Sequence, residues 1–216
     1  MNTRWRRGLA IAMVPLLLGA CHERPYASPV GRPYASPVGR QPFSHTDKLD
    51  AFIGKDFFTC CNLRFRDNGT TTDANYLFIG IANNFLPAGT PVRATRRGPH
   101  GLEIQPQAGG RRFYIAFRYG TERMGPADYF HLILRDTDPQ AGLQSTNPKI
   151  QKAIADGRLV RGMSKTEALV ARGYPPFHQT SGVESDEWIY FDAMSIVKRV
   201  RFVAGTIDSI ETGQAP

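Results

Sequence analysis

The chain has 216 residues, of which 41% are hydrophobic and 21% charged, a composition typical of globular proteins and sufficient for one large or two small domains. Its formal net charge is +8, but residues 44–216 carry 21 basic and 18 acidic side chains, so most of the excess precedes them. Nucleic-acid binding requires basic residues clustered on one face or a recognisable module. The pairs Arg96/Arg97 and Arg111/Arg112 are interpreted as solvated strand ends, and we expect no nucleic-acid partner.

The first twenty residues have the pattern of a cleaved export signal. Three arginines precede an apolar run over 9–20, which is too short to cross a bilayer core of about 30 Å. The run ends in Leu-Gly-Ala-Cys, which resembles a bacterial lipobox and implies cleavage between Ala20 and Cys21 and lipid attachment at Cys21. His22 follows in place of aspartate, so the resemblance implies an outer-membrane, periplasm-facing protein. A plain secretory signal with an accidental cysteine is the alternative.

An eight-residue sequence, RPYASPVG, then occurs twice in tandem, at 24–31 and 32–39. Two prolines in each copy disfavour helix and sheet, and two short copies cannot stack into a solenoid. Residues 21–43 are therefore interpreted as a tether, with a reach of about 70 Å if they are fully polyproline-like. A recognition motif built on Tyr26 and Tyr34 is the alternative.

Residues 44–146 are predicted to form a β-rich domain, because turn signals separate runs of aromatic and β-branched residues. The expected strands are 57–65, 75–82, 90–97, 101–106 and 111–118. The later strands and turns resemble a small SH3-like barrel by pattern alone. For 126–136 the apolar spacing predicts a helix, and a strand is the alternative.

Cys60 and Cys61 are adjacent in a chain expected to reach an oxidising compartment. In a continuous strand their side chains would point to opposite faces, and a bond between neighbours strains the backbone. The preferred interpretation is that both are small packing residues. A vicinal or intermolecular disulfide and a reactive thiol are the alternatives.

The sequence contains no motif for metal binding or nucleophilic catalysis. Its five histidines are scattered, and the zinc spacings HExxH and CxxC, the nucleophile motif GxSxG and the phosphate-binding glycine loops are all missing. We expect no metal, no cofactor and no enzymatic activity. An enzyme assembled from distant residues is the alternative, and its activity would depend on Cys60 or His131.

The last segment is predicted to contain two helices and three strands. Asn147 and Pro148 start a helix that Gly157 ends. Ser164 and Glu167 form a capping box at the start of the second. Gly173, followed by Pro175 and Pro176, ends this second helix. The expected strands follow at 187–191, 195–203 and 206–211, and the last two are joined by a hairpin turn at 204–205.

These features resemble the SmpA/OmlA (BamE-like) domain of outer-membrane lipoproteins over residues 147–212. The resemblance rests on Gly162-Met163-Ser164, Gly173-Tyr174-Pro175 and Trp188-Ile189-Tyr190. It implies an α+β fold class, with two helices packed on a three-stranded antiparallel sheet in the order helix, helix, strand, strand, strand. It also implies a non-catalytic protein-interaction module of envelope biogenesis, with β-barrel assembly subunits as partners. The residues that match the family motif are expected to be mostly structural: Gly162, Met163, Ser164, Glu167, Gly173, Pro175, Trp188 and Tyr190.

The better candidates for a partner contact are Tyr174, Pro176 and Phe177, in an aromatic and proline loop directly after a helix. The predicted organisation is a signal (1–20), the tether (21–43), the β-rich domain (44–146), the SmpA/OmlA-like domain (147–212) and a short tail (213–216). About 66 residues make a marginal core, so we expect the C-terminal domain to pack on the β-rich domain or on a partner. The alternative function is a periplasmic module whose β-rich domain binds peptidoglycan or a peptide.

Overall fold

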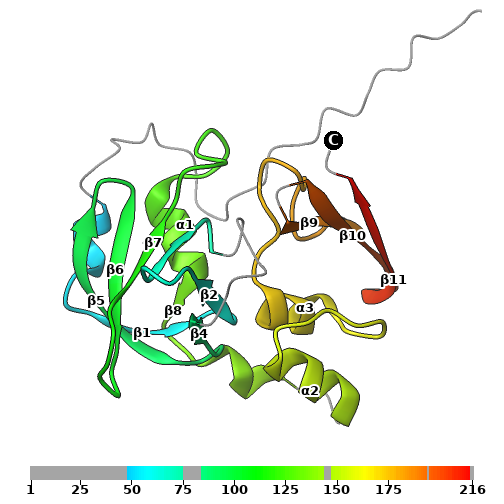
Figure 1. Ribbon diagram of the computed structural model, residues 1–216, viewed down its shortest axis with the longest axis horizontal. Helices are drawn as coiled ribbons and strands as arrows, with labels where there is room; N and C mark the ends of the chain where they lie inside the picture. Colours follow the sequence, from blue (N-terminus) through cyan, green and yellow to red (C-terminus); the bar gives the residue numbers. More distant parts are fainter. Residues whose placement is uncertain (1–47, 75–83, 144–146, 194, 215–216) are drawn as a thin grey trace, which may run out of the picture. The chain divides into compact units, whose positions relative to one another are not determined.

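The computed structural model describes residues 48–74, 84–143, 147–193 and 195–214, which fold as an α+β protein (Figure 1). The first part is β-rich and the second has two helices followed by three strands, as the sequence predicts. The elements of the first part are η1 (Leu49–Phe52), β1 (Asp56–Thr59), β2 (Leu63–Phe65), β3 (Thr70–Thr72), β4 (Asn84–Leu86), β5 (Pro91–Gly98), β6 (Gly101–Pro106), β7 (Phe113–Ala116), α1 (Pro126–Ile133), β8 (Leu134–Arg135) and η2 (Pro139–Gly142).

The main sheet of the first part has the strand order β3-β7-β6-β5-β1-β8, and β2 pairs separately with β4. Strands β5, β6 and β7 form an antiparallel meander, whereas β3 runs parallel to β7. Because the carboxyl ends of parallel strands meet at one edge of a sheet, the residues that follow β3 and β7 lie side by side. This pairing brings Asp73 next to the segment 117–120.

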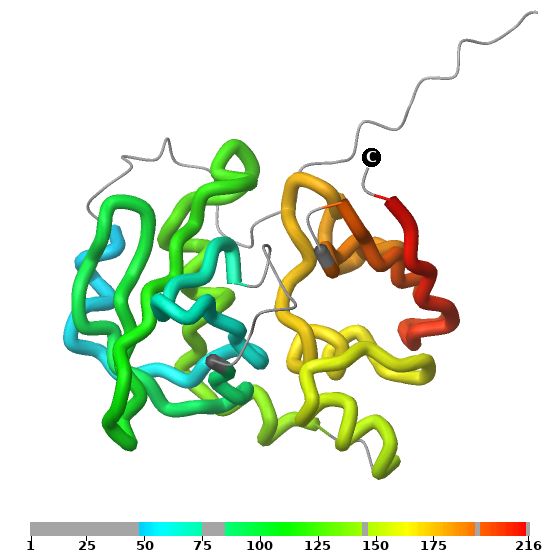
Figure 2. The backbone as a smooth tube through the Cα atoms, viewed as in Figure 1, coloured from blue at the N-terminus to red at the C-terminus, as the bar shows by residue number. Residues whose placement is uncertain are grey.

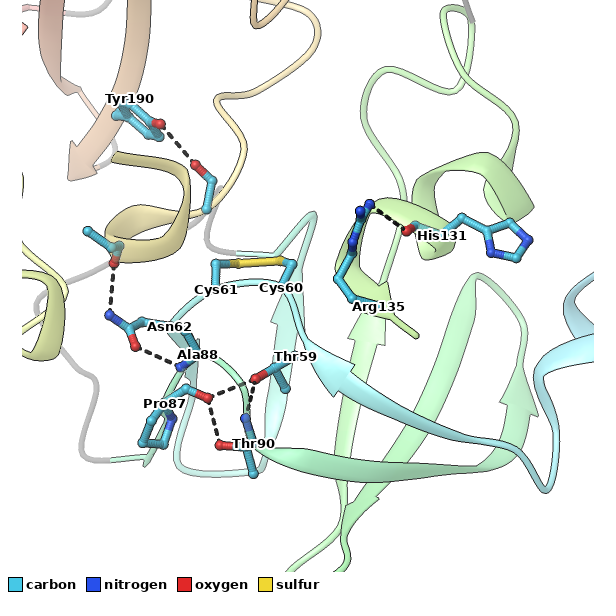
Figure 3. The surroundings of a disulfide bond; sticks show 12 residues. Thr59, Cys60, Cys61, Asn62, Pro87, Ala88, Thr90, His131, Arg135 and Tyr190 are labelled. Carbon is cyan, nitrogen blue, oxygen red and sulfur yellow. Dashed lines mark hydrogen bonds between the residues drawn. A yellow bond between two sulfur atoms is a disulfide. The ribbon is translucent and has the colours of Figure 1, made fainter. Parts of the chain in front are cut away.

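The prediction of one strand over 57–65 was wrong, because the chain bends at Cys60 and Cys61 and continues as a second strand in another sheet. The preferred interpretation of the two cysteines as unbonded packing residues was also wrong, since a disulfide joins them (Figure 3). In a bend, unlike a strand, neighbouring side chains do not alternate between two faces. Both cysteines are buried, as packing residues would be.

Other expected elements of the first part are largely present. The predicted strands at 90–97, 101–106 and 111–118 correspond to β5, β6 and β7. Residues 126–136 contain both alternatives, since α1 is followed directly by the two-residue strand β8. The short strands β3 and β4 were missed, and the expected strand 75–82 lies outside the described residues.

The second part consists of α2 (Pro148–Ala155), α3 (Lys165–Arg172), β9 (Glu187–Ala193), β10 (Ile196–Val203) and β11 (Thr206–Gln214). The side chain of Asn147 accepts a hydrogen bond from the Lys149 amide at the start of α2. At the start of α3 the Ser164 amide donates to Glu167 over 2.8 Å, and the Glu167 amide donates to the Ser164 hydroxyl over 3.2 Å. Both helix starts therefore have the caps that the sequence predicts.

The three strands form an antiparallel sheet in the order β11-β10-β9. Figure 2 shows the chain reversing tightly between β10 and β11. Ala204 and Gly205 have φ angles of 49° and 76°, as a two-residue hairpin turn requires. The predicted turn is confirmed. Among the described residues, no helix is both long and apolar enough to cross a membrane.

Two clusters of buried side chains make up the core. The larger one lies among β1, β5, β6, β7 and α1 and also contains Phe177, from the loop after α3. The smaller one lies between α2, α3 and the three-stranded sheet, and it also contains Ala88, from the loop after β4. Each part of the chain thus contributes a side chain to the core of the other. The predicted packing of the C-terminal segment on the β-rich segment is present.

A buried asparagine strengthens this contact. The Asn62 side chain donates to the carbonyls of Ile154 and Ala171, at the ends of α2 and α3, over 2.5 and 3.1 Å. Its oxygen accepts from the Ala88 amide over 2.8 Å (Figure 3). The Asn62 backbone amide adds a bond to the Val170 carbonyl. One polar residue, which is 3% exposed, thus connects the β-rich part with both helices of the second part.

Candidate functional site

A pocket opens where the loop after α3 meets the edge of the main sheet. It is a shallow pocket of about 250 Å³ when the open solvent at its mouth is counted, and its enclosed part is only about 10 Å³. Its lining residues are Asp73, Tyr119, Tyr129, Tyr174, Pro175, Pro176, Phe177 and His178. Five of these eight residues are consecutive, from Tyr174 to His178, and three of them are the predicted partner contacts. The loop that the sequence singles out therefore lines this pocket.

The loop 174–178 is held at both ends. Gly173 ends α3 with a φ angle of 89°, a backbone conformation that favours glycine. Its carbonyl accepts a hydrogen bond of 2.9 Å from the buried Tyr190 hydroxyl. Farther along, the Phe177 carbonyl accepts from the guanidinium of Arg123. The loop is therefore fixed by both parts of the chain.

Aromatic contacts set the walls of the pocket. The Tyr129 ring, on α1, stacks on Phe117 with centroids 4.2 Å apart, and it meets Phe177 edge-on at 6.4 Å. Tyr174 stacks on Phe177, also at 6.4 Å. Gly120 is required beside this cluster, since a Cβ atom there would lie 3.0 Å from that of Phe177. The buried rings leave Tyr119, which is 46% exposed, at the mouth.

The carboxylate of Asp73 is the charged group of the pocket. Its two oxygens accept hydrogen bonds from the amides of Arg118 and Tyr119, over 2.7 and 3.0 Å. Asp73 and Ala74 have φ angles of 45° and 39°, which are uncommon for residues other than glycine and often mark functional positions. The backbone thus holds this carboxylate in one orientation at the end of β3.

Burial raises the pKa of the Asp73 carboxyl to about 6, although the two amide donors and the Arg118 side chain act in the opposite direction. Burial also lowers the pKa of His178 from its usual value. At pH 7 the His178 ring is therefore mostly neutral, and Asp73 is mostly ionised. The lining of the pocket has a net negative charge under these conditions.

The hydroxyl of Tyr129 is the second polar group of interest. The residue is 1% exposed, and the hydroxyl has no hydrogen-bond partner among the described residues. Burial, and to a smaller extent the Asp73 carboxylate, raises its pKa well above the usual value. It therefore stays protonated at neutral pH. Buried polar groups are nearly always hydrogen-bonded, so this hydroxyl indicates a water molecule or a ligand group in the pocket.

The raised pKa of Asp73 predicts a pH dependence of stability. The folded protein binds a proton at Asp73 more tightly than the unfolded chain, so the stabilisation is greatest below pH 4 and is lost as the pH rises through about 6. One pKa unit corresponds to about 1.4 kcal/mol, so we expect a decrease of roughly 2 kcal/mol between pH 4 and pH 7. Urea unfolding of the wild type and of Asp73→Asn at pH 4 and at pH 7 measures this decrease in the free energy of unfolding. An equal pH dependence of the two proteins would contradict the assignment.

The residues of the family motif lie outside the pocket, apart from Pro175, and have structural surroundings. Met163 and Trp188 are fully buried in the smaller core cluster. Gly162 has a φ angle of 89° and donates to the Ile207 carbonyl, which fixes the start of α3 against β11. Ser164 and Glu167 cap α3, and the Tyr190 hydroxyl bonds to the end of the same helix. Ala20 and Cys21 lie outside the described residues.

Four pocket residues were not predicted as site residues: His178, which adjoins the predicted contacts, and Asp73, Tyr119 and Tyr129. The last three come from the β-rich part. Each lies in a different segment, and only the parallel pairing of β3 with β7 and the packing of α1 bring them together. The left-handed backbone of Asp73 and Ala74 marks this position only once the fold is known. Within the described ranges, no group of three or more His, Cys, Asp or Glu side chains could hold a metal ion. The His131 ring lies beside that of Phe52, with centroids 4.7 Å apart and the ring planes tilted by 45°.

Comparison of the chain with protein-family models, curated proteins and solved structures finds no match. The resemblance of residues 147–212 to the SmpA/OmlA domain therefore stays a prediction based on its motif residues.

Proposed function

We propose that this protein is a lipid-anchored, periplasm-facing protein of the outer membrane and a non-catalytic protein-interaction module in envelope biogenesis. The lipobox-like sequence at Cys21 supports the anchor, and the proline-rich repeats support a tether between the membrane and the folded part. The fold has the element order that the SmpA/OmlA resemblance implies. On that resemblance, subunits of the β-barrel assembly machinery are the first candidate partners.

The observation that carries the proposal is the aromatic pocket beside Tyr174. Clustered aromatic side chains are enriched at the centres of protein interfaces, because they offer large contact areas at low entropic cost. Here the rings surround a carboxylate and a buried hydroxyl that lacks a partner. The enclosed space is smaller than that of sites for large cofactors, and it admits only the tip of a partner side chain.

A second candidate is a peptide- or cell-wall-binding module that uses the β-rich part. It is favoured by one observation: Asp73, Tyr119 and Tyr129, which supply the carboxylate and two of the hydroxyls of the pocket, all belong to that part. Sedimentation of the unlipidated protein with purified cell wall tests this candidate. Retention in the supernatant would exclude cell-wall binding.

The anchor and the partner are tested together in a bacterium with two membranes. The wild-type chain and Cys21→Ala are expressed, labelled with a palmitate analogue and fractionated after in-cell crosslinking. We expect label on the wild type alone, wild type in the outer-membrane fraction with an envelope protein attached, and Cys21→Ala outside that fraction. Wild type that is unlabelled, or that is isolated with no envelope protein, would contradict the proposal.

A further inference from the structure

Two polar groups of the pocket are available to a ligand: the Asp73 carboxylate, which carries a charge, and the buried Tyr129 hydroxyl. Each Asp73 oxygen accepts one backbone hydrogen bond, and a carboxylate oxygen can accept more than one. The Tyr129 hydroxyl lies close enough to feel the Asp73 charge, yet it has no hydrogen bond among the described residues. Because both residues line the pocket, a group that donates several hydrogen bonds is the kind of ligand that suits them.

The charges around the pocket favour a cation. Asp73 is the ionised carboxylate of the lining, and His178 is mostly neutral at pH 7. Arg118 acts on the charge of Asp73, and Glu122 and Arg123 act in opposite directions on the charge of His178. Arg123 is held by the Phe177 carbonyl. An anion would meet the carboxylate, whereas a cation adds to the partial compensation that Arg118 and the two amides give its charge.

The size and the walls of the pocket narrow the choice of cation. The enclosed space of the pocket as a whole admits a group about as large as one water molecule. A primary ammonium has that size and three donors, whereas a planar guanidinium is larger. The walls of tyrosine, proline and phenylalanine suit the methylene groups of a lysine chain, and aromatic faces attract an ammonium.

We propose that this pocket binds a lysine side chain of the partner protein, whose ammonium donates hydrogen bonds to the Asp73 carboxylate and the Tyr129 hydroxyl. The methylene groups of the lysine then lie outside the enclosed space, across the mouth and beside the exposed Tyr119 ring. This inference rests on the proposed function and specifies the chemistry of the contact. The competing explanation is that the Tyr129 hydroxyl, which has no hydrogen-bond partner among the described residues, binds a water molecule and that the pocket takes no ligand.

The first test uses the mature protein and four small probes: Nα-acetyl-lysine N-methylamide, its Nε-acetylated form, and the arginine and norleucine analogues. Binding is followed by chemical-shift changes of the Tyr119 and Tyr174 rings. We expect the lysine probe to bind at least tenfold more tightly than the other three, because only it has both the charge and the size. Equal binding of lysine and norleucine, or of lysine and its acetylated form, would overturn the proposal. No variant is required for this comparison.

The second test uses variants. Asp73→Asn is expected to weaken lysine binding at least tenfold, and Tyr129→Phe about threefold, because each removes one acceptor of the ammonium. The matched control is Asp67→Asn, in an exposed turn, which should bind like the wild type. Asp73→Asn that folds and binds lysine as tightly as the wild type would overturn the proposal.

A failure of this inference can be separated from a failure of the proposed function. If Asp73→Asn loses lysine binding but still crosslinks the same envelope protein in cells, the lysine contact is wrong and the interaction module stands. If the lysine probe binds but the protein sediments with cell wall in an Asp73-dependent way, the amine belongs to a cell-wall peptide, and the assignment to a partner protein is overturned.

Discussion

Replacing Asn62 with alanine is expected to lower the free energy of unfolding by about 3 kcal/mol. The side chain makes three buried hydrogen bonds, to the Ile154 and Ala171 carbonyls and from the Ala88 amide. Alanine would leave all three backbone groups buried without that partner, and each such group costs roughly 1–3 kcal/mol when it cannot reach water. The expected loss is smaller than the sum of the three single costs, because the surrounding backbone relaxes in part and water enters the space that the side chain leaves. Urea denaturation of the two proteins measures the difference.

The matched control is Asn68→Ala. Asn68 is exposed, and its side chain makes only local bonds to Thr70, so we expect a loss of less than about 1 kcal/mol. A loss for Asn62→Ala no larger than that of the control would mean that the Asn62 bonds do not hold the two parts of the chain together.

Replacing Trp188 with alanine is expected to cost about 4 kcal/mol. Trp188 is fully buried between the helices and the three-stranded sheet, and its ring lies 4.5 Å from that of Phe202 and 6.3 Å from that of Tyr190. Its removal loses the free energy gained by transferring the indole from water into the core. It also leaves a cavity that the surrounding helices and strands can fill only in part. Denaturant unfolding, followed by circular dichroism because the change removes a fluorophore, measures the loss.

Val203→Ala is the control for Trp188. Val203 lies on the adjacent strand β10 but is 62% exposed, so its truncation should change stability by less than about 0.5 kcal/mol. A cost below about 1 kcal/mol for Trp188→Ala would show that this side chain is not central to the smaller core. Its assignment as a structural residue of the family motif would then be wrong.

The second part of the fold could be predicted well because its signals are local. Ser164 and Glu167 define the start of α3 within four residues, and Gly173 defines its end. The hairpin at Ala204-Gly205 likewise depends on two residues. Such features are determined by neighbours in the chain, so one sequence is enough to find them.

The first part was predicted less well because its strands are set by distant contacts. The bend at Cys60 and Cys61 has no glycine or proline to mark it, so a continuous strand was expected there. β3 is three residues long, and it is fixed by pairing with β7, more than forty residues away. Tertiary pairing of this kind overrides local strand preference.

The candidate site was half predicted for the same reason. Tyr174, Pro176 and Phe177 stand in one loop after a capped helix, where an aromatic cluster is visible in the sequence. Asp73 and Tyr129 lie fifty-six residues apart, and their approach depends on the parallel pairing of β3 with β7 and on the packing of α1. No spacing rule connects them, although the two residues with left-handed backbone at Asp73 and Ala74 mark the position once the fold is known.

Photo-crosslinking from the pocket in intact cells tests directly whether the pocket contacts an envelope protein. A photoreactive amino acid replaces Tyr119, at the mouth, and in a second strain it replaces Val203, which is also exposed but lies outside the pocket lining. We expect a crosslinked envelope protein from position 119, none from position 203, and a weaker product when Asp73→Asn is added. Equal products from both positions, or none from position 119 in the lipidated protein, would contradict it.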